Sequence, residues 1–212
     1  MKVDKPLLRG HFHQAMFFIS LGACLLLVAK SRTSQEWIAT SIYSFGVLTM
    51  FGISTLYHRI NWSSNARLKM KRLDHAGIYL MIAGTFTPIA LLTLEEPSRT
   101  HLLASIWGVA LIGILQSIFF VNLPKMISAI LYLIAGYLIL PYLSELKPAL
   151  GTWNVGLLVA GGIVYSIGAL TYGLKRPMLN PRIFSYHEVF HVLVSIGAIL
   201  HFCVIYSILS RN

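Results

Sequence analysis

The chain has 212 residues, of which 56% are hydrophobic and only 11% are charged. Because the apolar residues fall in long uninterrupted runs, this composition excludes a single soluble domain and predicts an all-α integral membrane protein. A net charge of +10 would suggest a nucleic-acid partner in a soluble protein. Here the cations lie in the links between apolar runs, so no nucleic-acid partner is expected.

Seven apolar runs follow one another along the chain, each close to the ~20 residues that a helix needs to cross a hydrocarbon core. They predict a seven-transmembrane helix bundle that forms a single domain over residues 1–212. No small-residue cleavage site follows the first run, so we interpret it as a retained helix rather than a signal peptide. The predicted spans are 13–29, 37–57, 76–94, 102–121, 126–143, 152–174 and 187–209.

The cations divide unequally between alternate links, and this division predicts the orientation of the bundle. Twelve lie in the N-terminal tail and in the second, fourth and sixth links, and five lie in the other links and at the C-terminus. By the positive-inside rule, the N-terminus is cytoplasmic and the C-terminus is outside. The twelve are Lys2, Lys5, Arg9, Arg59, Arg67, Lys69, Lys71, Arg72, Lys125, Lys175, Arg176 and Arg182.

Two histidines, His187 and His191, open the seventh run one helical turn apart. Residues at i and i+4 share one helix face, so both imidazoles can reach a single metal ion. His191 lies a full turn inside the apolar run, where an unpaired imidazole is costly to bury. His58 ends the second run and falls at the same membrane level as the pair. The three imidazoles are therefore candidate metal ligands, although periodicity alone does not show that their helices are neighbours.

Two further polar residues fall at this level: Ser54, one turn deeper than His58, and Asp74, which directly precedes the third run. Three neutral imidazoles leave the fourth position of a tetrahedral Zn²⁺ to water, as in catalytic zinc sites. Asp74 is then the candidate general base, and Ser54 the candidate donor to the water or to a developing oxyanion. Each also has a structural alternative, with Asp74 as a helix N-cap and Ser54 bonded to a carbonyl one turn back.

The motifs together resemble those of the bacterial hemolysin III family. They are Ser-x-x-x-His at 54–58, the stretch Leu73-Asp74-His75-Ala76-Gly77-Ile78-Tyr79 with Gly84-Thr85-Phe86-Thr87-Pro88, and His-x-x-x-His at 187–191. That family is related to the progestin and adipoQ receptors and, more remotely, to the alkaline ceramidases. The resemblance implies a seven-helix protein of a bacterial cytoplasmic membrane, with zinc bound near the cytoplasmic face by His58, His187 and His191. Asp74 and Ser54 would lie beside its water.

The resemblance also implies a function, a zinc-dependent ceramidase-like hydrolase of an amide or ester in a lipid that enters from the bilayer. Two alternatives stay open. In one, the protein is non-enzymatic, a membrane-homeostasis or receptor-like protein with structural zinc. In the other, His187-Glu188-x-x-His191 is the HExxH motif of an intramembrane protease, with Glu188 as its base. The protease needs a third ligand further along the chain, where His201 is the one remaining imidazole, so we expect Glu188 to be a dispensable interfacial carboxylate.

The remaining histidines near these spans are expected outside the metal site. His11 and His13 flank the first span and are expected in the headgroup region. His75 lies about 100° around the helix from Asp74, which favours an interfacial or hydrogen-bonding role. His201 lies about 21 Å along the helix from His187 and is expected to bond to a neighbouring helix.

Overall fold

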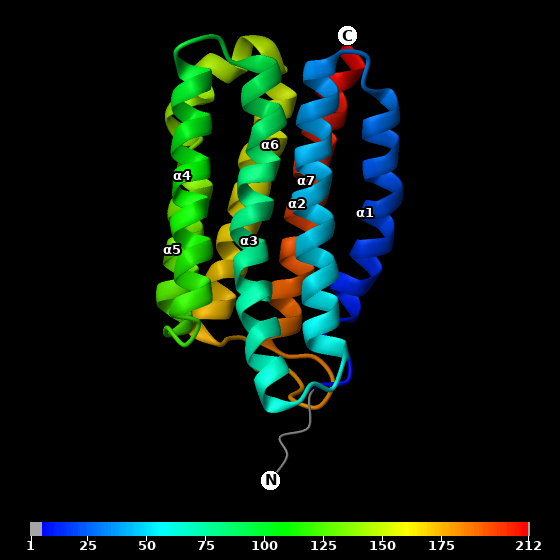
Figure 1. Cartoon of the computed structure of the whole chain (residues 1–212), viewed down its shortest axis with the longest axis vertical. Coiled ribbons are helices and arrows are strands. Elements are labelled where there is room, and N and C mark those ends of the chain that lie inside the picture. The colour runs from blue at the N-terminus through cyan, green and yellow to red at the C-terminus, as the bar shows by residue number, and fades with distance from the viewer. Residues whose placement is uncertain (1–5, 212) are drawn as a thin grey trace.

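The computed structural model describes residues 6–211 and is all-helical apart from loops and one isolated bridge between Asn180 and Phe184. The helices form one bundle, in which α1 begins and α7 ends at opposite ends (Figure 1). The elements are α1 (His11–Lys30), α2 (Ser34–Arg59), α3 (Ser64–Thr93), α4 (Ser98–Phe119), α5 (Lys125–Tyr137), the 3₁₀ helix η1 (Leu140–Tyr142), α6 (Leu143–Leu174) and α7 (Tyr186–Arg211).

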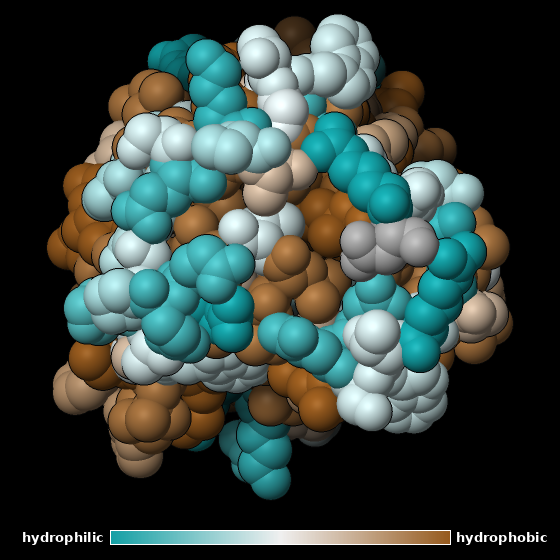
Figure 2. All heavy atoms as spheres, turned by 90° about the horizontal axis from the view of Figure 1, so that it is seen from above, coloured by the Kyte–Doolittle hydropathy of each residue, from teal (hydrophilic) through white to brown (hydrophobic). Residues whose placement is uncertain are grey.

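Six helical segments of the described chain are long and apolar enough to cross a membrane. Large apolar side chains such as Phe18, Ile112 and Trp153 are exposed on the outer surface, where lipid would cover them. Figure 2 looks onto the end of the bundle where α7 ends, where hydrophilic side chains spread over the face with hydrophobic ones between them and along the margin. The predicted multi-pass integral membrane protein is confirmed by these helices.

One of these segments, Lys125–Leu174, is an apolar stretch of 50 residues that contains α5, η1 and α6. It reverses direction, because Gly173 near its end lies against Met126 at its beginning, and the Tyr137 and Ser166 hydroxyls are 2.7 Å apart. The helix is interrupted at Gly151, whose φ of 74° is a conformation that favours glycine. The predicted link between residues 143 and 152 is therefore helical up to the interruption at Gly151, and the chain leaves α5 earlier, at η1 (Leu140–Tyr142).

Helix α3 begins much earlier than the predicted third span, at Ser64 rather than at residue 76. The additional turns carry Arg67, Lys69, Lys71 and Arg72, so they extend the helix beyond the apolar run. This places Asp74 well inside α3. The structural alternative in which Asp74 is a helix N-cap is therefore wrong, and its carboxylate is available for other contacts.

Small residues bring α2 and α3 close together. A Cβ added to Gly46 would lie 2.9 Å from the Leu80 carbonyl oxygen, and one added to Gly84 would lie 3.2 Å from the Ile42 carbonyl oxygen. Glycine at these points lets the two backbones touch, as at many membrane helix interfaces. The close packing fixes the C-terminal end of α2, with His58, beside the turn of α3 that carries Asp74.

Candidate metal centre

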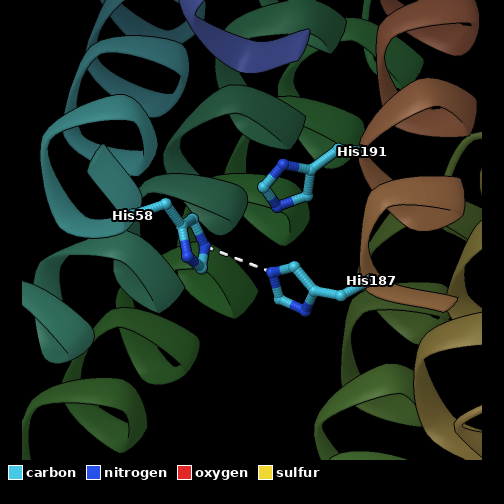
Figure 3. A group of neighbouring side chains, drawn as sticks. All are labelled: His58, His187 and His191. Atoms are coloured by element: carbon cyan, nitrogen blue, oxygen red, sulfur yellow. Dashed lines mark hydrogen bonds between the residues drawn. The ribbon is translucent and has the colours of Figure 1, made fainter. Parts of the chain in front are cut away.

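Three imidazoles meet at the end of the bundle where α2 ends and α7 begins. Figure 3 shows the His58 ring pointing from α2 toward the His187 and His191 rings, which project from consecutive turns of α7. All three side chains are buried. The Nε2 atoms of His58 and His187 are 3.2 Å apart, and one ring nitrogen from each histidine lies within 4.8 Å of the others. The structure thus brings together the three histidines that the sequence proposed as ligands.

The spacing of these nitrogens suits a metal ion. Two nitrogens bound to a tetrahedral zinc at ~2.0–2.1 Å lie about 3.3 Å apart, close to the His58–His187 separation. Buried polar atoms normally have a hydrogen-bond partner, yet His191 Nδ1 is buried without one in the described part of the chain. A cluster of three buried imidazoles with an unpartnered nitrogen can hold a metal ion.

Asp74 and Ser54 lie beside this cluster. The Asp74 Oδ2 atom is 3.8 Å from His58 Nε2, which places the carboxylate next to a candidate ligand nitrogen but not in a direct hydrogen bond with it. The Ser54 side chain is buried, and its hydroxyl lies 2.9 Å from a ring nitrogen of His13. The Ser54 hydroxyl therefore contacts a side chain of another helix at the site, and this contact differs from the alternative, a bond to a carbonyl one turn back in α2.

A fourth histidine, His13 of α1, belongs to the site although the sequence placed it in the headgroup region. That expectation is wrong, because His13 is only 2% exposed and its ring stacks on the ring of His191. Its Nδ1 lies 2.9 Å from the Ser54 hydroxyl. The sequence offered a weak signal: His13 is two residues from His11, which places the two on nearly opposite helix faces. His11 is part-exposed and contacts Arg59.

The hydrogen bond between His13 and Ser54 joins α1 to α2 beside the candidate metal site. A hydroxyl both donates and accepts, and the ring nitrogen does either according to the tautomer of the imidazole, so both directions fit this contact. His13 Nε2 is buried without a partner in the described residues. Side chains from α1, α2 and α3 thus meet at the polar end of the site.

A cavity of about 440 Å³ opens from this site into the bundle. Its polar end is lined by His13, Ser54, Asp74 and the three candidate ligands. Beyond them the wall is mostly apolar and extends to residues such as Leu158 and Ile163 of α6. Some lining residues of α5 and α6 are also exposed on the outer surface, among them Tyr137 and Ile163.

Comparison with known proteins identifies the family. A family model described as haemolysin-III related matches residues 1–202. The chain belongs to this family. Hemolysin-3 of Bacillus cereus is 35% identical over 195 residues, which cover 90% of this chain and 86% of that protein. The hemolysin-3 homolog of Bacillus subtilis (strain 168) is 33% identical over 184 residues, covering 85% and 83%.

A more distant relative is the adiponectin receptor protein of Drosophila melanogaster, 27% identical over 208 residues, which cover 86% of this chain and 46% of the receptor. The resemblance to the hemolysin III family is thus confirmed, and the match to an adiponectin receptor supports, at lower identity, the relation to that group of receptors. The chain is an integral multi-pass membrane protein of the hemolysin III-related family.

Glu188 has a different environment in this hemolysin III-related protein from the one expected. It is fully buried and forms an ion pair with Arg9, whose Nε donates to it, while its Oε2 accepts from the Ser185 backbone N–H at 2.8 Å. The interfacial location was therefore wrong. Both carboxylate oxygens are used to fix the start of α7 and the segment before α1, an arrangement typical of a helix-capping glutamate.

His75 and His201 lie outside the three-histidine cluster, as expected. His75 Nδ1 donates to the Lys71 carbonyl at 2.9 Å, although its ring also lines the cavity and lies 3.8 Å from Asp74. His201 Nε2 is 3.1 Å from the Leu158 carbonyl of α6. The predicted bond from His201 to a neighbouring helix is confirmed.

Proposed function

We propose that this protein is a zinc-dependent hydrolase that cleaves an amide or ester bond in a membrane lipid. One observation carries the proposal: Asp74 lies 3.8 Å from a candidate ligand nitrogen, at the polar end of a cavity whose remaining wall is largely apolar. A purely structural zinc site would need neither an adjacent carboxylate nor a cavity. Nitrogen-only donors favour zinc over calcium or magnesium, which prefer oxygen.

The roles of the side chains follow from their positions. When bound, zinc supplies Lewis-acid activation of water and of a carbonyl oxygen. His58, His187 and His191 hold it through ring nitrogens. The Asp74 carboxylate accepts the proton that water loses as the water oxygen adds to the carbonyl carbon. It then returns the proton to the leaving amine or alcohol as the carbon–nitrogen or carbon–oxygen bond breaks.

Ser54 orients Asp74 in this proposal. A hydrogen bond donated by its hydroxyl to the carboxylate would leave one Asp74 oxygen for the water proton. For Ser54 to polarise the substrate, as its position in the sequence suggests, the hydroxyl would turn from Asp74 toward the developing oxyanion. Both roles require Ser54 at this place on α2.

The lipid enters from the side. Tyr137 of α5 and Ile163, Ile167 and Leu170 of α6 line the cavity, and each is also exposed on the outer surface. Where one side chain both lines the cavity and is exposed on the outer surface, a single layer of side chains separates the cavity from the lipid. This supports an opening between α5 and α6 toward the hydrocarbon core. A lipid chain could pass there without crossing water.

The proposed topology is seven membrane spans in one domain over residues 1–212 of a bacterial cytoplasmic membrane. The reversal within Lys125–Leu174 supports counting α5 and the later part of α6 as two spans. A cytoplasmic N-terminus is supported by the cations at the histidine end of the bundle, among them Arg59, Arg67 and Lys125. Lys2 and Lys5, which also entered the orientation argument, lie outside the described residues.

The experiment measures bound zinc and the release of fatty acid from a panel of lipid amides and esters. It compares the parent protein with Asp74→Ala, with Glu188→Ala and with Glu96→Ala, an exposed acid at the opposite end of the bundle. We expect Asp74→Ala to retain zinc and lose hydrolysis, and Glu96→Ala to match the parent.

Two results would redirect the assignment. If Glu188→Ala keeps its fold and zinc but loses hydrolysis while Asp74→Ala stays active, the hypothesis of an HExxH protease with Glu188 as its base replaces the proposed role of Asp74. If the parent binds zinc but releases no fatty acid, the non-enzymatic alternative replaces it, a membrane-homeostasis or receptor-like role of the kind that the adiponectin receptor relative's name describes.

A further inference from the structure

The polar end of the cavity is lined by four cations that come from separate parts of the chain. They are Arg9 before α1, Arg67 and Lys71 on α3, and Lys125 at the start of α5. Among the described residues that line the cavity, Asp74 is the one acid. The mouth of the candidate site is therefore strongly positive, before any metal charge is added.

Three of these cations have no carboxylate partner in the part of the chain that the structure describes. Arg9 is neutralised by Glu188, but within residues 6–211 no carboxylate lies at ion-pair distance from Arg67, Lys71 or Lys125. Their contacts are neutral. Lys71 Nζ donates to Asn122 Oδ1 at 3.0 Å, and Lys125 Nζ donates to the Tyr186 hydroxyl at 2.9 Å. The Arg67 guanidinium lies over the Tyr57 ring.

Lys71 and Lys125 are also close enough to repel each other. Both are partly buried, and Lys125 is packed between the rings of Tyr172 and Tyr186, 4.6 Å and 4.8 Å from their centroids. Two like charges held together at the rim of an apolar cavity are unfavourable unless an anion lies between them. Their neutral partners hold the ammonium groups in place without cancelling their charge.

We propose that this cationic rim, Arg67, Lys71 and Lys125, binds an anionic head group, a phosphate or sulfate, of the lipid whose chain occupies the apolar part of the cavity. Lysine and arginine donate strong charge-assisted hydrogen bonds to phosphate oxygens. Lys71 is one helical turn from Asp74, so a head group on the rim places the first bonds of the lipid chain beside the three histidines. The inference rests on the proposed hydrolase and gives its substrate class.

The positive-inside rule alone would also place cations at this end of the bundle. It does not require them to line a cavity, however, and Lys69 provides the comparison. Lys69 lies two residues from Lys71 on the same helix, is exposed, and does not line the cavity. The positive-inside rule is thus sufficient to explain Lys69, whereas the place of Lys71 in the cavity wall needs a further reason.

The test compares two lipids that differ only in the head group, a ceramide and the same ceramide carrying a phosphate monoester. The proteins are the zinc-loaded parent, Lys71→Gln/Lys125→Gln, and the matched control Lys69→Gln, all in detergent micelles. Glutamine keeps a donor for Asn122 and Tyr186, so the neutral contacts can persist. We measure kcat/KM for each lipid and the rise in Tm that each lipid causes, since a bound ligand stabilises the folded state without turnover.

We expect the parent and Lys69→Gln to favour the phosphorylated lipid by about tenfold, because a charge-assisted contact is worth roughly a factor of ten or more. The double variant should lose this preference in both measurements. If the parent hydrolyses neither lipid but its Tm still rises selectively with the phosphorylated one, the hydrolase fails and the head-group site stands.

Two outcomes overturn the inference. One is equal treatment of the two lipids by the parent, in both rate and Tm. The other is a double variant that keeps the parent's preference. A separate arm adds inorganic phosphate at millimolar concentration. If phosphate alone reproduces the whole Tm rise, the rim binds the free ion, and its assignment to a lipid head group is wrong.

Discussion

The ring of His13 lies flat against the ring of His191, with centroids 3.7 Å apart and planes inclined by only 5°. The two residues come from the first and the last helix of the chain. The stack covers one face of a candidate ligand ring, so His191 can rotate less freely about its side-chain bonds. His13 thus links the position of a candidate ligand to the hydrogen bond between its own ring and the Ser54 hydroxyl.

The two contacts of His13 can be separated by substitution. His13→Phe keeps a ring against His191 but removes the bond to Ser54, whereas His13→Ala removes both. We expect His13→Ala to bind zinc about 10-fold more weakly, the lower end of the range for groups that orient metal ligands, and His13→Phe to bind zinc like the parent. Competition with a chelating dye measures both affinities. Equal zinc affinity of His13→Ala and the parent would show that the stack does not position His191.

Zinc binding should also raise the thermal stability of the folded protein. An ion that binds only the folded state raises Tm, and its removal by a chelator lowers Tm. We expect a chelator to lower the Tm of the parent and of His201→Gln, since His201 bonds to the Leu158 carbonyl rather than joining the cluster. It should leave the Tm of His191→Ala unchanged. A chelator effect that persists in His191→Ala would place the metal elsewhere.

The ion pair between Arg9 and Glu188 predicts a coupled effect on stability. Glu188→Gln can still accept the Ser185 N–H but loses the charge, so it leaves Arg9, which is 21% exposed, without its partner. We expect a loss of roughly 1–3 kcal/mol in the free energy of unfolding. Arg9→Gln/Glu188→Gln should lose less than the sum of the two single variants, because no unpaired charge remains. Strictly additive losses would contradict a direct interaction.

Much of the fold could be predicted because a helix must be about 20 apolar residues long to cross the membrane, and the chain repeats that length. The pairing of His187 with His191 could be predicted for a similar reason, since an i, i+4 spacing needs only one helix. Which helices are neighbours depends on tertiary packing, which hydrophobic periodicity does not determine. The contact of α1 with α7 could therefore not be predicted, and the place of His13 in the site was missed.

Hydropathy failed at two other places for related reasons. It assigned the first turns of α3 to a loop, because Arg67, Lys69 and Lys71 are charged although they are good helix formers. It assigned Glu188 to the interface because an isolated carboxylate is costly to bury. Arg9 lies 179 positions away in the chain, and only the folded structure brings it to Glu188.

Two glycines of α4 provide a matched test of the packing between α3 and α4. A Cβ added to Gly113 would lie 2.3–2.5 Å from ring atoms of Tyr79, a fully buried side chain, whereas a Cβ added to Gly108 would meet nothing within 4 Å. We expect Gly113→Ala to lower the free energy of unfolding by about 1–3 kcal/mol, the usual cost of overpacking. Gly108→Ala should be neutral or slightly stabilising, because alanine favours a helix. Thermal unfolding in detergent measures both, and equal Tm values for the two variants would show that Tyr79 can move aside without cost.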